Sequence, residues 1–116
     1  MKTRLIILFG SRITGTARIE SDFDVAILAD NPLSLEEKDQ TTSEVAAKLN
    51  ISFDKIDLVD ISVASPLLQH SIAKTGKLIS GEKEDFLRFK VLAWKKYLDT
   101  AKFRARREVH LRNTLR

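Results

Sequence analysis

The chain has 116 residues and a mass of 13.2 kDa, which predicts a single domain over residues 1–116. With 43% hydrophobic and 31% charged residues, neither a disordered nor a fibrous chain is expected. The lack of cysteine excludes disulfides, thiolate metal sites and cysteine nucleophiles. No apolar run reaches membrane-spanning length and the first residues do not resemble a signal peptide, so we expect a cytoplasmic protein with no membrane partner.

The net charge of +4 is unevenly distributed. Residues 1–81 hold nine Lys/Arg against eleven Asp/Glu, a net charge of −2, whereas residues 82–116 hold eleven against five, a net charge of +6. This division predicts an acidic site in the body and a basic helix at the end. Such a helix could dock an acidic groove of a partner protein or form a solvated face, and contact with RNA ranks behind both.

Three apolar segments predict strands. Residues 5–9 are continuously apolar and end at a glycine, as a strand buried on both faces would. Residues 23–28 form a second strand that is closed by Asp30-Asn31-Pro32, and residues 55–61 form a third. A brief extended segment is expected over residues 77–80.

Helices are predicted between and after these strands. A short helix should follow the first strand, a second begins at the capping box of Ser34 and Glu37 and stops near residue 50, and a third begins at Ser65-Pro66 and ends at Gly76. Apolar residues 35, 42, 45, 46 and 49 should share the buried face of the second helix. From residue 82 onward the pattern is helical, with two packed stripes: Phe86, Phe89, Ala93, Tyr97 and Ala101, and Leu87, Val91, Trp94, Leu98 and Ala105. The predicted fold class is α/β (α+β), a small mixed sheet packed by helices.

The chemically richest stretch, GSRITGTARIESDFD, runs from Gly10 to Asp24. A strand that ends at Gly10-Ser11 and turns into a helix presents free backbone N–H groups, a positive dipole and a hydroxyl, which suits a phosphate. Asp22 and Asp24 open the second strand and project to the same side, because strand side chains alternate. Two adjacent carboxylates favour a cation between them, and Mg²⁺ is the natural candidate.

A third carboxylate lies in the apolar third strand. Asp57 can join Asp22 and Asp24 if this strand neighbours the second, and three acids around one or two Mg²⁺ suit in-line transfer at a nucleotide phosphorus. One of the acids could accept the proton of the incoming hydroxyl. Two alternatives stay open: Asp60 could take the role of Asp57, or both could solubilise an edge strand.

The Gly-Ser pair, the ten residues that separate it from Asp22-x-Asp24, and the later strand Asp57 resemble the DNA-polymerase-β-like nucleotidyltransferase superfamily. The small size, the GSRxxG opening and the SDFD pair are most similar to its minimal nucleotidyltransferases, the MNT antitoxins that are encoded beside HEPN-domain toxins. The resemblance covers about residues 3–80 and implies a polymerase-β-like catalytic core, to which the basic helix of residues 82–116 is added.

The resemblance implies transfer of AMP from ATP to a tyrosine hydroxyl of a cognate HEPN ribonuclease toxin, which is thereby neutralised, with Mg²⁺ as cofactor. The third acid would be a metal ligand or the general base. A second arginine of this branch is replaced here by Thr14. The residues implied for catalysis and metal binding are Asp22, Asp24 and Asp57, and those implied for the nucleotide are Gly10, Ser11 and Arg12.

Two rival functions stay open. One is a small-molecule nucleotidyltransferase of the aminoglycoside-modifying type, and the other is a non-catalytic antitoxin that acts by occlusion with its long basic helix. Larger members of the superfamily carry a substrate-recognition domain for which 116 residues leave no room, so a protein acceptor is favoured. His70, Trp94 and Tyr97 are expected to pack in the core or at an interface rather than to act on substrate.

Overall fold

A computed structural model describes residues 3–10 and 22–114, with side chains described as far as residue 101. The short helix predicted after the first strand lies outside these residues. Within them, the chain forms four strands and three α-helices in the order β1 (Thr3–Phe9), β2 (Phe23–Ala29), α2 (Leu35–Leu49), β3 (Ile56–Asp60), α3 (Pro66–Thr75), β4 (Lys77–Gly81) and α4 (Lys83–Thr114). Single 3₁₀ turns, η1 (Phe53–Lys55) and η2 (Ile61–Val63), flank β3.

The strands form one mixed sheet in the order β3-β2-β1-β4. β1 is antiparallel to both β2 and β4, whereas β2 and β3 are parallel. A parallel pair needs a crossover of a dozen or more residues, and α2 supplies it between β2 and β3. The small mixed sheet packed by helices that the sequence predicts is confirmed, as are its three strands and the extended segment that becomes β4.

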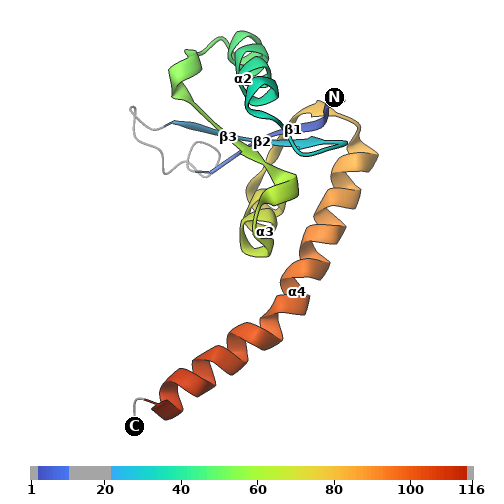
Figure 1. Cartoon of the computed structure of the whole chain (residues 1–116). Helices are drawn as coiled ribbons and strands as arrows, with labels where there is room; N and C mark the ends of the chain where they lie inside the picture. The colour runs from blue at the N-terminus through green and yellow to red at the C-terminus, as the bar shows by residue number, and fades with distance from the viewer. Residues whose placement is uncertain (1–2, 11–21, 115–116) are drawn as a thin grey trace.

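Helices cover both faces of the sheet, because β1 and β2 present apolar side chains to either side. α2 packs on one face over a buried cluster that comprises Val25, Ile27, Ala29, Leu33 and Val45. α3 and α4 pack on the other face over Leu5, Ile7, Phe9, Ala26, Ile61, Ile72, Phe89 and Ala93. Figure 1 shows α2 above the sheet and α3 below it.

The predicted helix starts are confirmed in detail. Ser34 caps α2, because its hydroxyl accepts the Glu37 N–H while the Glu37 carboxylate accepts the Ser34 N–H. Ser65 caps α3 by accepting the Leu68 N–H, with a proline in the first turn where no intrahelical donor is needed. α3 stops at Gly76 as expected.

One expectation about α2 is wrong. Leu35 was predicted to lie on the buried face, but its side chain is 81% exposed. The predicted positions 42, 45 and 46 are buried, and Thr41 joins them on the buried face. The hydroxyl of Thr42 donates to the Lys38 carbonyl within the helix, so its methyl group can pack inward without an unpaired polar atom.

The prediction of two packed stripes on α4 is half right. Phe89 and Ala93 are buried in the core, but the second stripe (Leu87, Val91, Trp94 and Leu98) is exposed. The helix touches the body along one side only, and its C-terminal half runs clear of the sheet (Figure 1). Although α4 is long, it is strongly charged, and none of the helices in the described ranges is both long and apolar enough to cross a membrane.

Asp60 ties the end of β3 to the segment that precedes α2. Its buried carboxylate accepts the Leu33 N–H at 2.8 Å, the Ser62 N–H at 3.0 Å and the Ser62 hydroxyl at 2.7 Å. Burial by itself would raise the pKa of Asp60, but these hydrogen bonds outweigh it and hold the pKa below its ordinary value.

Asp60→Ala should therefore lower the free energy of unfolding by about 1–3 kcal/mol, because the buried N–H of Leu33 and the partly buried N–H of Ser62 lose their acceptor. Since the pKa is lowered in the folded state, this stabilisation is present above the ordinary value of 3.8 and is lost as the pH falls further. Urea titrations at pH 7 and at lower pH test both statements. Asp54→Ala, at an exposed position of η1, is the matched control and should change little. A variant as stable as the native chain at pH 7 would contradict this role.

Candidate active site

Strand pairing brings three of the predicted site residues, Gly10, Asp24 and Asp57, to one end of the sheet. Phe9 is the register partner of Asp24 in the antiparallel pair, and Asp24 is the register partner of Asp57 in the parallel pair. Gly10 follows Phe9 directly, and Asp22 comes just before β2. The condition on which the role of Asp57 rested, that β3 neighbours β2, is therefore met.

Asp24 and Asp57 also share one face of the sheet. Ala26 of β2 and Val59 of β3 belong to the cluster beneath α3 and α4. Asp24 and Asp57 each lie two residues before one of these positions, so they are on that same face. Asp22 lies two residues before Asp24, just ahead of β2, and its charge acts on Asp24. Asp57 and Asp22 are exposed and Asp24 is partly buried, so the site is open to solvent.

The proximity of these carboxylates alters the ionisation of Asp24. Its pKa is raised, first because burial removes water from the charged form and then because Asp57 and Asp22 repel it. The residues present thus fit a divalent cation with a preference for oxygen ligands, which would relieve this repulsion. No group of three or more His, Cys, Asp or Glu among residues 3–10 and 22–101 forms a ready-made metal cage. Mg²⁺ needs none, because it usually takes one or two carboxylates together with substrate phosphates and water.

Gly10 makes the close approach of β1 to Asp24 feasible. Its backbone has a φ of +85°, which side-chain-bearing residues rarely adopt, and an added Cβ would lie 2.1 Å from Asp24 Oδ2. The sequence indicates a turn here, but only the structure shows that the missing side chain is the space that Asp24 occupies. Ser11 and Arg12, the other two residues expected to contact the nucleotide, lie outside the described residues.

The two candidate acids of β3, Asp57 and Asp60, lie on opposite faces of the sheet. Asp60 alternates to the opposite face from Asp57, towards α2, and its register partner is Ile27, three positions along β2 from Asp24. Its oxygens are already used by Leu33 and Ser62. The alternative in which Asp60 replaces Asp57 is therefore not supported by this geometry. β3 is an edge strand, as the second alternative assumed.

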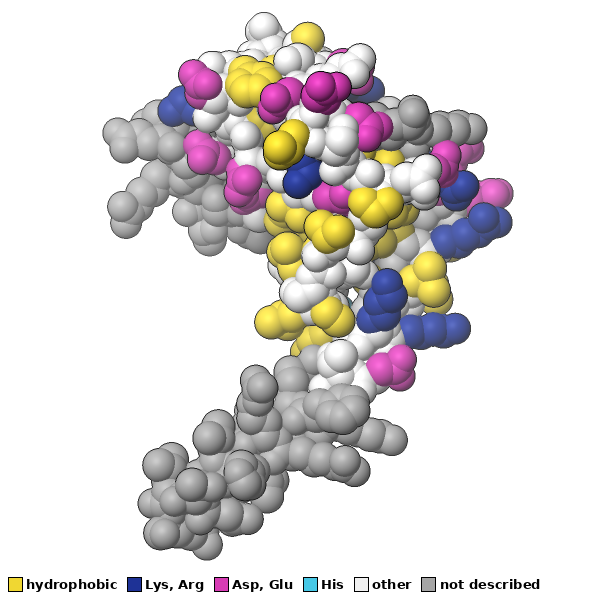
Figure 2. Space-filling view, in the orientation of Figure 1, with side chains coloured by type: hydrophobic (Ala, Val, Ile, Leu, Met, Phe, Trp, Pro, Cys, Tyr) yellow, Lys and Arg dark blue, Asp and Glu magenta, His cyan; other side chains and the backbone are white. Residues whose placement is uncertain are grey.

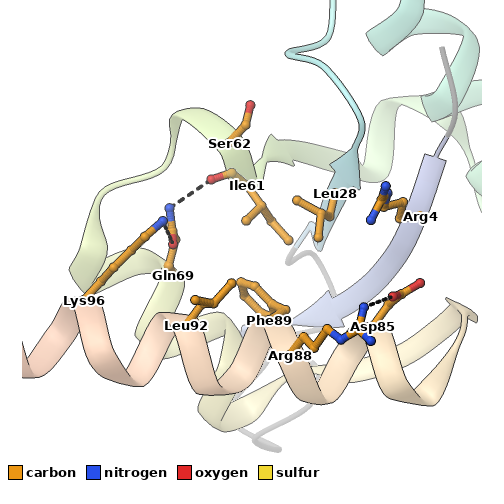
Figure 3. Close-up of a pocket in the computed structure, with 10 residues that line it drawn as sticks. All are labelled: Arg4, Leu28, Ile61, Ser62, Gln69, Asp85, Arg88, Phe89, Leu92 and Lys96. Carbon is orange, nitrogen blue, oxygen red and sulfur yellow. Dashed lines mark hydrogen bonds and ion pairs between the residues drawn. The ribbon is translucent and has the colours of Figure 1, made fainter.

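A separate cavity of about 240 Å³ lies at the other end of the sheet, between η2, α3 and α4 (Figure 3). Its polar groups largely satisfy one another: Gln69 donates to the Ile61 carbonyl, Lys96 donates to Gln69 Oε1, and Arg88 pairs with Asp85. This cavity shares no residue with the carboxylate site.

The aromatic residues noted in the sequence pack between α3 and α4. The His70 ring stacks on Tyr97 with centroids 3.8 Å apart, and Trp94 lies at the edge of the pair, 5.5 Å from His70. This agrees with the packing role expected for them.

The comparisons with known proteins agree with the fold. The family model for the polymerase beta nucleotidyltransferases matches residues 1–85. That match covers most of the chain and includes β2, β3 and all three acids. The chain therefore belongs to the polymerase beta nucleotidyltransferase family.

Two curated relatives with similar sequences share one name within this family. The protein adenylyltransferase MntA of Aphanizomenon flos-aquae is 34% identical over 92 residues, which is 71% of this chain and 59% of the relative. The protein of the same name from Shewanella oneidensis is 38% identical over 85 residues, which is 72% of this chain and 58% of the relative. The chain thus spans a little under three fifths of the length of these relatives.

Solved structures of similar proteins match over nearly all of the chain. A chain of a toxin–antitoxin crystal structure with AMP-PNP superposes with a TM-score of 0.74 at 29% identity, covering 100% of this chain and 89% of that one. A second structure, described as a tri-AMPylated Shewanella oneidensis HEPN toxin in complex with MNT antitoxin, gives a TM-score of 0.67 at 27% identity. It covers 99% of this chain and 85% of the matched chain.

Asp24→Asn should make the metal-free protein more stable at neutral pH, by up to about 1 kcal/mol for a partly exposed charge. Because the pKa of Asp24 is raised in the folded state, the native chain loses stability as the pH rises through that pKa, and the variant does not. The difference in Tm between the two should therefore be larger at pH 7.5 than at pH 4. A variant less stable than the native chain at pH 7.5, with EDTA present, would contradict the crowding of these acids.

Proposed function

We propose that this chain is an antitoxin nucleotidyltransferase that transfers AMP from ATP to a tyrosine hydroxyl of a cognate HEPN ribonuclease toxin and thereby neutralises it. The observation that carries the proposal is the convergence of Gly10, Asp24 and Asp57 at one end of the sheet. The relatives named as protein adenylyltransferases, and the similar structure of an AMPylated HEPN toxin with its MNT antitoxin, support the acceptor. The AMP-PNP in another similar structure supports ATP as the donor.

In this proposal Asp22, Asp24 and Asp57 would hold Mg²⁺, whose charge would offset that of the triphosphate and of the attacking and leaving oxygens. The toxin's hydroxyl oxygen forms a bond to the α-phosphorus of ATP, the bond from that phosphorus to the bridging oxygen breaks, and pyrophosphate leaves. Asp57, exposed at the edge of the site, accepts the proton of the hydroxyl. Gly10 lets the backbone approach the phosphates, and Ser11 and Arg12 add contacts to them.

The charge of Asp24 makes this site dependent on pH. Metal binding needs the ionised carboxylate, and the raised pKa of Asp24 means that protons compete for it at a higher pH than they would for an ordinary aspartate. Nucleotide binding through the cation should weaken as the pH falls through that pKa.

The division of the chain into a catalytic core and a basic helix is part of the same proposal. A catalytic core of about residues 3–80 is followed by a basic C-terminal helix from residue 82, and the reaction takes place in the cytoplasm, where ATP is available. The relatives named as protein adenylyltransferases favour a protein acceptor over a small molecule such as an aminoglycoside.

The decisive experiment takes a HEPN-domain protein from a gene neighbouring that of this chain as the candidate acceptor. The two are incubated with ATP and MgCl₂, and the intact mass of the HEPN protein is measured. We expect a gain of one or more AMP masses, which EDTA prevents. Asp24→Asn should slow the transfer at least about 100-fold, because metal stabilisation of transition-state charge is worth several kcal/mol. Asp54→Asn, exposed on η1, is the matched control and should transfer at the native rate.

The same assay distinguishes AMP transfer from the rival function, inhibition of the toxin by occlusion. If the HEPN protein is silenced by a stable complex with no change in mass, and Asp24→Asn still silences it, the chain acts by occlusion. That outcome would contradict the proposed reaction.

Gly10→Ala should also slow the transfer by about 100-fold, because a Cβ there displaces Asp24 from its position in the site. Gly81→Ala is the matched control: Gly81 also has a positive φ of +127°, and an added Cβ would lie 2.3 Å from the Arg4 carbonyl, at the far end of the sheet. Both variants should lose stability, but only Gly10→Ala should lose activity per folded molecule at a temperature where both are folded. Equal losses of activity would contradict a specific role for Gly10.

A further inference from the structure

The exposed stripe of α4 has a regular spacing. Leu87, Val91, Trp94 and Leu98 follow one another at intervals of four, three and four residues. This is the spacing of the a and d positions in a heptad, which places apolar side chains on one narrow face of a helix. We call these four residues the α4 seam.

Apart from the Trp94 ring, one edge of which packs near His70 and Tyr97, the α4 seam lies outside the core. Its side chains are 63%, 48%, 54% and 49% exposed, in chain order, whereas Phe89 and Ala93, on the opposite side of the helix, are buried. A shallow hollow of about 400 Å³ runs beside it, lined by Leu87, Arg88, Val91 and Leu92. Four large exposed apolar residues in one row are typical of an interaction surface.

Basic residues flank the seam on both sides. In the heptad register with Val91 at position a, the e and g positions that border an a/d seam fall on Lys83, Arg88, Lys90, Lys95 and Tyr97, so four of these five are cationic. Arg88 lies 3.9 Å from Asp85, and Lys90 Nζ lies 4.5 Å from the centre of the Phe86 ring. Figure 2 shows Lys and Arg side chains gathered along α4, while Asp and Glu gather at the other end of the molecule, over α2.

The basic residues that flank the seam favour an acidic partner helix over a second copy of this chain. Two copies of the seam would face each other with cations at e and g in either a parallel or an antiparallel arrangement, and like charges there are repulsive. A helix with the same apolar row but with Asp or Glu at its borders would pair attractively. The seam spans about 16 Å, three helical turns, which suits a docking contact within a larger interface rather than a free-standing coiled coil.

We propose that the α4 seam binds an amphipathic helix of a partner protein whose apolar stripe is bordered by acidic residues. The identification of that partner with the HEPN toxin rests on the proposed function, but the seam and its required charge do not. The seam holds the partner on the outer face of α4, so that the acceptor hydroxyl is delivered to the carboxylates by another segment of the partner.

The first test uses designed helical peptides of about four heptads, with leucine at a and d and either glutamate or lysine at every e and g position. Fluorescence anisotropy should show that the native chain binds the glutamate peptide and that Val91→Asp weakens this binding at least about 10-fold. The lysine peptide should not bind. Leu35→Asp, at the 81% exposed position of α2, is the matched control and should bind as the native chain does.

The charge requirement has its own test. Lys95→Glu should weaken binding of the glutamate peptide, and the binding of the native chain should fall as the salt concentration rises. Lys48→Glu, exposed near the end of α2, is the control and should have no effect. No binding of the glutamate peptide, or equal binding of both peptides, would overturn the proposal. A native chain that dimerises in sedimentation equilibrium, with the dimer lost in Val91→Asp, would assign the seam to a second copy and also overturn it.

The last test uses the candidate HEPN protein from the neighbouring gene and measures both complex formation and AMP transfer. Val91→Asp should lose the complex with it, whereas Asp24→Asn should keep the complex and lose AMP transfer. If Val91→Asp keeps the complex while Asp24→Asn loses transfer, the docking proposal fails and the proposed function stands. If Val91→Asp loses the complex and no transfer occurs with the native chain, the docking proposal stands and the proposed function fails.

Discussion

The site depends on the parallel pairing of β2 with β3. This pairing sets Asp24 opposite Asp57 and places both on the face of the sheet that α3 and α4 cover. The proximity is unfavourable in the protein alone, because burial and the charges of Asp57 and Asp22 raise the pKa of Asp24. The fold therefore holds in place an arrangement that a bound cation would stabilise, which is how a metal-assisted nucleotide site is preorganised.

The rest of the chain holds that pairing in register. α2 makes the crossover that a parallel pair needs, and its buried face closes one side of the sheet. Asp60 anchors the far end of β3 through the backbone N–H of Leu33, just ahead of α2. A slip of one residue in β3 would send Asp57 to the α2 face and break this anchor, so the buried Asp60 network holds the register on which the site depends.

Much of this could be predicted from the sequence, because the signals are local. The capping box of α2, the Ser65 cap of α3, the strand alternation and the Gly-Ser and Asp-x-Asp spacing depend on residues that are close together in the chain. The assignment of Asp57 over Asp60 depends on which strands pair and on which face each residue lies, and only the tertiary structure gives that information. The exposure of Leu35 and of the α4 seam was missed for a related reason: apolar residues at helical spacing indicate a face that packs, but not whether its partner belongs to the same chain.

The central claim is that the clustered carboxylates form a cation-dependent nucleotide site. Calorimetric titration of the chain with a non-hydrolysable ATP analogue, with MgCl₂ or with EDTA, tests it without any partner protein. The account predicts binding that requires Mg²⁺ in the native chain and that is lost or strongly weakened in Asp57→Asn. Binding that is equally tight in EDTA, or that is unchanged in Asp57→Asn, would contradict it.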